Sequence, residues 1–414
     1  MGAVTRKIPE WRDEFQPQWP SLYKEVREYE LLTPLVGGGA QPLEPDPVTV
    51  VRASSIKGQL RFWWRAIRGW KARGDLQKLR DLEEKYFGSV GEEGRQGPSP
   101  VVLRVIPRSE PKPKEAWETR TKPTEIAPGY LSFPLQPQRG GVPSGKVILN
   151  VKFALEIQLR PPKGLSLEEL KREVHAALWA WETFGGVGAR TRRGFGAVVR
   201  LRTDGSYAQR TAEQVQDQIK EKLRQYVEDT QWPAGVPHLT PNSPVAVVQE
   251  SWKKVAEQYR RFRQSRGSGG RGKSLWPEPK TIRMLRKNPT KTGKFPRGQL
   301  GLPIIFHFKE KEDEVYNSIL KPKSKEYDRL ASPLIFRPIA EEMTVVAVLQ
   351  GSREVPGGVQ LEFNMDQTSV DVEVQLDKGE AAKIRVLNGQ TDVVQAAFDH
   401  LTRRHRGGKG GYRR

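Results

Sequence analysis

The stretch GGVGARTRRGFG at residues 185–196 decides the fold of this chain. Two Gly–apolar–Gly triplets, at 186–188 and 194–196, flank five residues that include three arginines. Glycines let a backbone turn sharply and let a ligand approach closely, and arginines form forked contacts with phosphates. A plain helix–strand connection would not explain this symmetry. We therefore predict a ligand-gripping loop whose contact residues are Gly186, Gly188, Arg190, Arg192, Arg193, Gly194, Phe195 and Gly196, although Phe195 is as suited to the core as to stacking on a base.

The segments around this loop predict a split β-α-β-β-α-β domain over residues 1–205. Strands are expected at 26–36 and 195–202, and alternation predicts another at 146–159. Apolar residues at helical spacing follow Ser54 and Ser55, and Ser166 with Glu169 form the pattern of a capping box. We read 88–145 as an insertion around a short strand at 101–106. The expected domain is ferredoxin-like, and its four-stranded sheet is a common platform for RNA.

The second half, residues 206–402, is expected to be a second ferredoxin-like domain, which makes the fold class α+β with two tandem domains and loop insertions. A helix is predicted at 208–228, and another from Ser243, with a short strand at Val245–Val248 before the helix as the alternative. A basic insertion covers 264–297. Residues 403–414 are expected to form a disordered basic tail. Further strands are predicted at 302–308, 333–337, 343–350, 359–363 and 369–375, and a last helix at 390–402.

The charge of the chain is segregated. The net charge is +21, and the stretches 52–73, 190–202, 260–297 and 403–414 together carry +30, which leaves −9 for the rest. Clustered cations indicate a polyanionic partner, because neutralising phosphates releases condensed counterions. A cationic thermophilic surface would spread the surplus more evenly. A membrane surface fits less well, because no helix pairs a basic face with an exposed apolar one.

Several protein classes do not fit the composition. The chain has no cysteine, and its five histidines do not show metal-ligand spacing, so we expect no disulfide, no metal and no cofactor. No apolar run has the length of a membrane span, and the first residues lack the apolar core of a signal peptide. The expected setting is the cytoplasm.

Residues 267–274, GSGGRGKS, match the phosphate-binding pattern of many nucleotide hydrolases. The context argues against that function: the preceding YRRFRQSR is not a buried strand, and LWPEPKT contains two prolines that block a helix interior. We interpret the stretch as a basic loop that contacts a phosphate backbone through Arg266, Arg271 and Lys273.

A second set of candidate contacts lies at the start of the first helix. Lys57, Arg61, Arg65 and Arg68 follow helical spacing beside the apolar stripe. A helix N-terminus favours an anion, and Ser54 or Ser55 suits either capping or phosphate binding. Trp64, beside the core residue Trp63, is a candidate for the sheet edge, a partner or RNA. The predicted contacts are Arg52, Ser54, Ser55, Lys57, Gly58, Arg61 and Arg65.

These motifs resemble the RAMP superfamily of CRISPR-associated proteins, whose hallmark is such a glycine-rich loop. LLTPLVGGGA (31–40), RASSIKGQLRFWWRA (52–66) and RLASPLIFRP (329–338) narrow the resemblance to the first RAMP-type subunit of the type III-B effector, the Cmr complex. The resemblance implies a non-catalytic subunit that binds single-stranded guide and target RNA near the 3′ end of the guide, among other Cmr subunits. The stretch 264–297 matches none of these motifs.

Two other functions stay open. Some RAMP relatives cleave RNA by general acid–base chemistry, which usually needs a histidine, and His175 is the nearest one to the glycine loop. A lone histidine on a helix is more often structural. Alternatively, the basic patches face acidic partner subunits and the protein is a scaffold.

Overall fold

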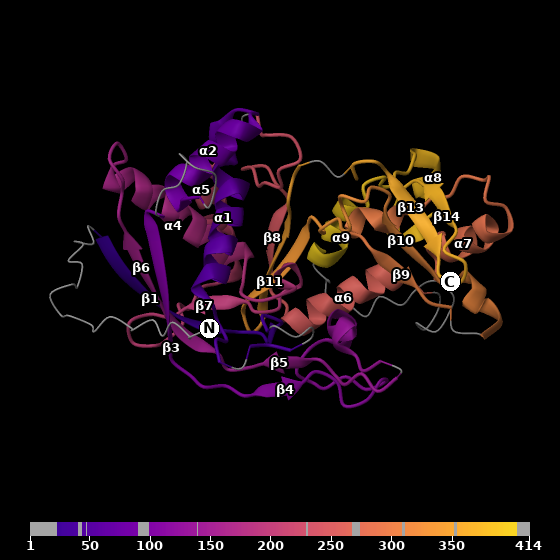
Figure 1. Cartoon of the computed structure of the whole chain (residues 1–414), viewed down its shortest axis with the longest axis horizontal. Coiled ribbons are helices and arrows are strands. Elements are labelled where there is room, and N and C mark those ends of the chain that lie inside the picture. The colour runs from indigo at the N-terminus through magenta and orange to yellow at the C-terminus, as the bar shows by residue number, and fades with distance from the viewer. Residues whose placement is uncertain are drawn as a thin grey trace, which may run out of the picture.

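The computed structural model describes residues 23–39, 44–46, 48–89, 99–138, 140–228, 231–266, 274–308, 311–351 and 354–403. It is an α+β structure with several small antiparallel sheets, which confirms the α+β part of the predicted fold class (Figure 1). The N-terminal elements form one lobe, and most C-terminal elements form a second lobe beside it. The predicted tail falls outside the described residues, except for Arg403.

The largest sheet of the first lobe contains β1 (Tyr23–Leu31), β3 (Val101–Pro107), β6 (Lys152–Leu159) and β7 (Val198–Arg200). Its order is β3-β6-β1-β7, and every neighbouring pair is antiparallel. Two helices, α1 (Ala53–Arg68) and α4 (Leu167–Phe184), pack together with this sheet, and α2 (Leu76–Phe87) lies beside them. Side chains alternate along β1, so Tyr29 and Leu31 are buried while Lys24 and Val26 are exposed.

Three sequence predictions in this lobe were wrong. The expected strand 26–36 is divided into β1, which ends at Leu31, and β2 (Leu35–Val36), which belongs to another sheet. The stretch 146–159 is two strands, because Asn150 adopts a left-handed backbone (φ 56°) between β5 (Lys146–Ile148) and β6. In a separate sheet, β5 lies between β2 (Leu35–Val36) and β4 (Pro113–Glu115). The strand at 101–106 is an edge strand of the main sheet and not part of an insertion. Ser166 caps α4 as predicted, by accepting the Glu169 N–H at 3.1 Å.

A three-stranded sheet lies between the lobes. It contains β8 (Val245–Val248), β11 (Leu334–Ala340) and β12 (Met343–Val348) in the order β11-β12-β8. The helix predicted from Ser243 therefore begins only at Trp252: Val245–Val248 pairs with β12, and the Ser251 side chain caps α6 (Trp252–Gln264). The strand alternative was correct, because four consecutive residues with three valines suit a sheet better than a first helical turn.

Both faces of this middle sheet are buried. Ile335 and Val345 belong to the core of the first lobe, whereas Phe336 and Val346 pack with α6 and α9 (Val393–Thr402). The same strands therefore contribute to two cores, which joins the lobes. Before β8, α5 (Ala212–Tyr226) packs on the first lobe, where the Tyr226 carbonyl accepts hydrogen bonds from Arg68 and Trp70.

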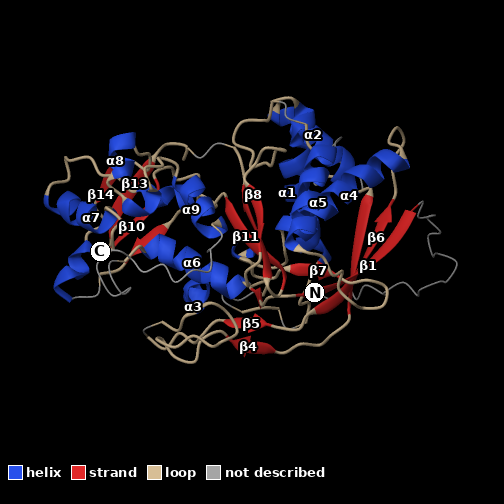
Figure 2. Cartoon of the chain, turned by 180° about the vertical axis from the view of Figure 1, so that it is seen from behind, coloured by secondary structure: helices blue, strands red, loops and turns tan. Residues whose placement is uncertain are grey.

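The second lobe adds a sheet of β9 (Ile304–Phe306), β10 (Ser318–Pro322), β13 (Val359–Phe363) and β14 (Ser369–Val372), in the order β14-β13-β10-β9. Helix α7 (Glu278–Lys287) packs on it, and α8 (Lys378–Ala382) follows β14 (Figure 2). The two prolines of LWPEPKT (275–281) were expected to block a helix interior. Instead Pro277 and Pro279 lie at the start of α7, where a missing N–H costs no hydrogen bond.

Candidate nucleic-acid interface

The glycines of the loop allow the chain to approach itself. The two triplets hydrogen-bond to each other through Val187 N–H and the Gly196 carbonyl (2.9 Å), and Ala189 N–H bonds the Val36 carbonyl (2.7 Å). A Cβ on Gly196 would lie 1.9 Å from the Val187 carbonyl oxygen, and one on Gly186 would lie 2.6 Å from the Gly196 oxygen. We expected these glycines to admit a ligand; instead their close contacts are with protein backbone.

Two of the three loop arginines bind the second half of the chain. Arg192 Nη1 donates to the Ser332 carbonyl (2.5 Å), and Arg193 Nη1 donates to the Leu334 carbonyl (2.6 Å). Arg193 Nη2 also donates to the Tyr259 hydroxyl at 3.0 Å. Burial lowers the pKa of Arg192 to about 10, and the positive charge of Arg193 adds to this effect. These side chains therefore hold β11 against the loop.

Arg337 of β11 makes the reciprocal contact. Its side chain is buried and donates to the carbonyls of Gly185 (2.8 Å) and Val198, which lie at the two ends of the loop region. Burial lowers the pKa of Arg337 to about 9. Sequence reasoning quoted the motif around Arg337 without assigning this role. The available signal was an arginine inside an otherwise apolar strand, since a buried arginine needs several acceptors.

Arg190, the third loop arginine, differs from Arg192 and Arg193 in its surroundings. Its backbone is left-handed (φ 62°), and its Nε is shielded from solvent with no acceptor among the described residues. Burial and the charge of Arg193 lower the pKa of Arg190. In the described part of the chain, none of the three loop arginines forms an ion pair with a carboxylate. Arg192 instead lies over the ring of Phe62 (5.3 Å), and Arg193 over Tyr259 (4.8 Å).

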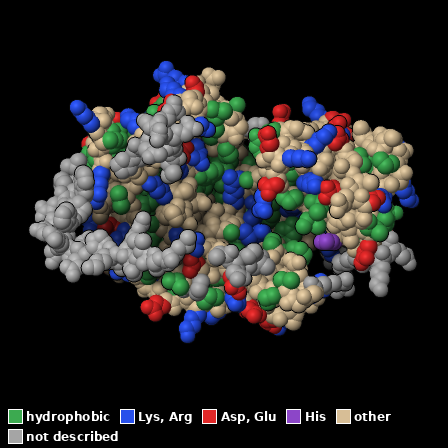
Figure 3. Space-filling model, in the orientation of Figure 1, with side chains coloured by type: hydrophobic (Ala, Val, Ile, Leu, Met, Phe, Trp, Pro, Cys, Tyr) green, Lys and Arg blue, Asp and Glu red, His purple; other side chains and the backbone are tan. Residues whose placement is uncertain are grey.

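Figure 3 shows Lys and Arg side chains gathered in a hollow between the two lobes. The loop arginines reach β11 and α6, which lie in this region of Figure 1. By contrast, the open face of the β3-β6-β1-β7 sheet balances its charges: Lys24 pairs with Glu156 (2.7 Å) and Arg108 with Glu28 (2.9 Å). The expected RNA platform on that sheet therefore lacks a cationic excess at these positions.

The start of α1 is exposed, but its serines are not caps. Arg52 occupies the N-cap position without a side-chain hydrogen bond to the helix, and Ser54, Ser55 and Gly58 are exposed. The first turn has no acidic residue, which leaves the positive end of the helix dipole uncompensated by a carboxylate there. Burial and the charge of Arg61 lower the pKa of Lys57.

The other predicted cationic contacts at and along α1 have carboxylate partners within the chain. Arg61 and Arg65 share Glu83 of α2, with Arg65 at 2.6 Å. Arg52 pairs with Asp46. Arg68 is buried against Glu173.

Two predicted aromatic contacts are core residues. Phe195 is completely buried and packs edge-on against Trp252, with ring centroids 5.0 Å apart. Trp64 is also completely buried, between Tyr86 and Phe87, and its indole N–H donates to Glu173. Neither ring is available to a base.

In the described part of 264–297, several cations pair with carboxylates. Arg283 pairs with Asp313, Arg286 with Asp366 and Lys294 with Glu373, each within 2.7 Å. Arg266 is exposed and forms a backbone bridge with Ser274. Arg271 and Lys273 lie outside the described residues, as does most of the GSGGRGKS stretch.

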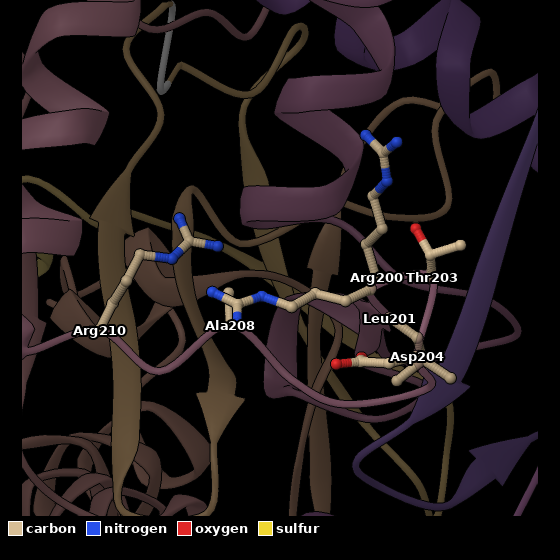
Figure 4. Close-up of a pocket in the computed structure, with 7 residues that line it drawn as sticks. Arg200, Leu201, Thr203, Asp204, Ala208 and Arg210 are labelled. Atoms are coloured by element: carbon tan, nitrogen blue, oxygen red, sulfur yellow. The ribbon is translucent and has the colours of Figure 1, made fainter.

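A second basic hollow was not predicted. A cavity of about 560 Å³ after β7 is lined by Arg200, Arg202 and Arg210, together with Asp204 (Figure 4). Asp204 is engaged by the backbone N–H and hydroxyl of Ser206. The basic run 190–202 pointed to two of these arginines, but Arg210 joins them only through the fold.

His175 lies on α4 and contacts the sheet. Its Nε2 is 3.0 Å from Glu25 Oε2, and its ring meets Tyr23 edge-on. Burial raises the pKa of Glu25, but hydrogen bonds with His175 and Arg27 outweigh this and hold it well below its usual range. Among the described residues, no three His, Asp or Glu side chains form a metal site, and no helix has the length and apolar character to cross a membrane.

Comparison with known proteins gives consistent matches. Residues 28–199 match the RAMP superfamily model. The chain is 32% identical over 156 residues to the CRISPR system Cmr subunit Cmr1-1 of Pyrococcus furiosus, which is 37% of this chain and 41% of that protein. It is 27% identical over 182 residues to Cmr1-2 of the same organism, covering 43% and 95% of the two chains. The crystal structure of apo Cmr1 from P. furiosus aligns with a TM-score of 0.47 and 19% identity, over 80% of this chain and 89% of that one.

Proposed function

Residues 28–199 of this chain belong to the RAMP superfamily, and from that premise we propose that the protein is an RNA-binding subunit of a type III-B CRISPR effector, the Cmr complex. Its ligand is single-stranded RNA, in the form of guide RNA and its target, and its other partners are Cmr subunits. The assignment to the Cmr complex rests on the two P. furiosus relatives, both of which are named as subunits of the CRISPR Cmr system. The chain spans 41% of one relative and 95% of the other.

One observation carries the RNA-binding function. The loop arginines lie beside aromatic rings and have no described carboxylate partner, and Arg190 has a buried donor without an acceptor. Phosphate oxygens are the acceptors that suit such guanidinium groups. Lys57, near the N-terminus of α1, extends the cationic surface. Because these groups recognise backbone and not base edges, binding has little sequence preference, and specificity comes from guide pairing.

The strand orders support the tandem ferredoxin-like interpretation. In the first lobe, strands one to four of a β-α-β-β-α-β unit are β1, β3, β6 and β7, which places them in the sheet order 4-1-3-2. The succession β8-α6-β11-β12-α9 places its three strands in the order 1-3-2. Within the described part of the chain, this second unit shows no fourth strand after α9, and the β14-β13-β10-β9 sheet is built from its two insertions, 265–333 and 349–392.

We further propose that the subunit does not cleave RNA. The cleavage alternative rests on His175, which is held by Glu25 and is about 15 Å along α4 from the glycine loop, at 1.5 Å per residue. The scaffold alternative draws support from Arg192 and Arg193, because both bind carbonyls of the same chain. Arg190 and Lys57 are the residues that distinguish RNA binding from the scaffold alternative. Neither forms an ion pair with a described carboxylate, so both are the cations to test for a phosphate contact.

The test is a salt series of single-stranded RNA binding by fluorescence anisotropy. Wild type is compared with Lys57→Ala/Arg190→Ala and with a matched double variant, Lys78→Ala/Arg80→Ala, whose exposed side chains lie on α2. Each lost phosphate contact lowers the log–log salt slope by ~0.7, so the first double variant loses ~1.4. The α2 variant keeps the wild-type slope. Equal slopes for all three proteins, or RNA cleavage in the same tubes, would contradict the proposal.

A further inference from the structure

A cavity of about 600 Å³ lies between α6 and the short helix α3 (Gly129–Ser132). Figure 2 shows the two helices next to each other. The walls of the cavity include Pro128, Tyr130, Lys253, Glu257 and Arg260. The size is in the range of ligand sites, and the lining combines one aromatic ring with donors and acceptors. No sequence motif identified this site.

Tyr130 connects the cavity with buried cations. Its ring meets the ring of Tyr259 edge-on, with centroids 6.2 Å apart, and Tyr259 accepts the hydrogen bond from Arg193. Arg190 and Arg263 both lie close enough to Tyr130 and Tyr259 for the two phenol groups to act electrostatically on the pKa of each arginine. Tyr130 therefore borders the cavity, and the guanidinium groups of Arg193 and Arg263 lie over the ring of its neighbour Tyr259.

These two arginines have unfulfilled hydrogen-bonding capacity. The Nε of Arg190 and the Nε of Arg263 are both shielded from solvent, and neither has an acceptor among the described residues. Leaving a buried charged donor unpaired is costly, so such groups normally have a partner. Arg190 also holds a left-handed backbone conformation that a non-glycine residue rarely adopts. Both guanidinium groups therefore keep hydrogen-bonding capacity that no described protein group uses.

We propose that the cavity receives one unpaired nucleotide of the bound RNA, with its base against Tyr130 and its phosphate on Arg190 and Arg263. This inference rests on the proposed RNA-binding function and deepens it. Stacking on an aromatic ring tolerates any base, and every base edge offers groups that suit the mixed lining of Lys253 and Glu257. The strand is therefore gripped through both its phosphates and one extruded base.

The experiment compares two ligands on the full chain: an oligouridine and a ribose-phosphate strand of equal length without bases. Stacking of one base changes affinity by about 5- to 150-fold. Wild type and Tyr130→Phe are expected to prefer oligouridine by such a factor. Tyr130→Ala loses that preference, keeps the wild-type salt slope and binds the base-free strand like wild type.

The outcomes separate this inference from the proposed function. If wild type binds both strands equally, the cavity does not hold a base, whatever Tyr130→Ala does to folding. If Tyr130→Ala retains the preference while Arg190→Ala lowers the salt slope, the RNA clamp stands and the cavity proposal is overturned. If wild type binds neither strand, the proposed function fails as well.

Discussion

Replacing Glu173 by Gln tests the buried ion network that fixes α4 against α1. Glu173 is completely buried and accepts hydrogen bonds from Trp64 (2.9 Å), Arg68 (2.9 and 2.7 Å) and Lys71 (2.7 Å). Burial alone raises its pKa, but Arg68 and Lys71 outweigh burial and hold the pKa at about 2. The difference from its usual value of 4.5 corresponds to about 3 kcal/mol of stability at neutral pH.

We therefore expect Glu173→Gln to lower the free energy of unfolding by about 3–5 kcal/mol at pH 7, because it leaves Arg68 buried without a counter-charge. Urea unfolding followed by tryptophan fluorescence measures this, with Glu168→Gln in the exposed first turn of α4 as control.

The pH dependence has a definite sign. A carboxylate with a depressed pKa stabilises the fold above about pH 4.5, and this contribution disappears as the pH falls towards 2. The difference between wild type and Glu173→Gln should shrink over that window. If Glu173→Gln unfolds like Glu168→Gln at pH 7, or if the difference does not change with pH, the reasoning is refuted.

Three more predictions concern the loop and the alternative site. Gly196→Ala should cost about 3 kcal/mol or more in thermal or urea unfolding, because the new Cβ meets the Val187 carbonyl; Gly164→Ala, with a similar positive φ but open space, should cost only about 1–2 kcal/mol. Arg193→Lys should cost about 1–3 kcal/mol in urea unfolding through lost bonds to β11, and an unchanged midpoint would argue against the contact between the lobes. His175→Ala should bind RNA like wild type in anisotropy titrations, and an RNA cleavage activity that disappears in this variant would revive the endonuclease reading.

Much of the fold was accessible from local sequence patterns. Helical spacing identified α1, α4 and α5, because each of these helices buries one face and periodicity records it. Strands β3 and β11 to β14 and helix α9 were also predicted near their observed positions, although β11 and β12 are buried on both faces. The errors fell where pattern and tertiary context diverge. Val245–Val248 fits a helix stripe or a strand, and only pairing with β12 decides between them. Asn150 splits one apolar run by a single backbone angle, which no periodicity reports.

The sequence indicated which loop residues to examine, but it did not indicate what each of their side chains contacts. The glycine loop and its arginines do meet the second half of the chain, yet the glycines contact backbone, and Arg192 and Arg193 donate to carbonyls. Sequence spacing cannot distinguish a guanidinium that binds protein from one that awaits a ligand, because both need only a nearby acceptor. Tyr130, Tyr259 and Arg263 are distant from the loop in sequence, so only the fold could place them beside it.

The central claim is that RNA lies in the hollow between the lobes, along the glycine loop and α6. The most direct measurement is photo-cross-linking of wild-type protein to single-stranded RNA that carries 4-thiouridine, followed by mass spectrometry of the linked peptides. We expect cross-links in peptides that contain Lys57, Tyr130, the 189–193 segment or α6. Cross-links confined to the open face of β1 and β6, or to the Arg200–Arg210 hollow, would place the RNA elsewhere and contradict the account.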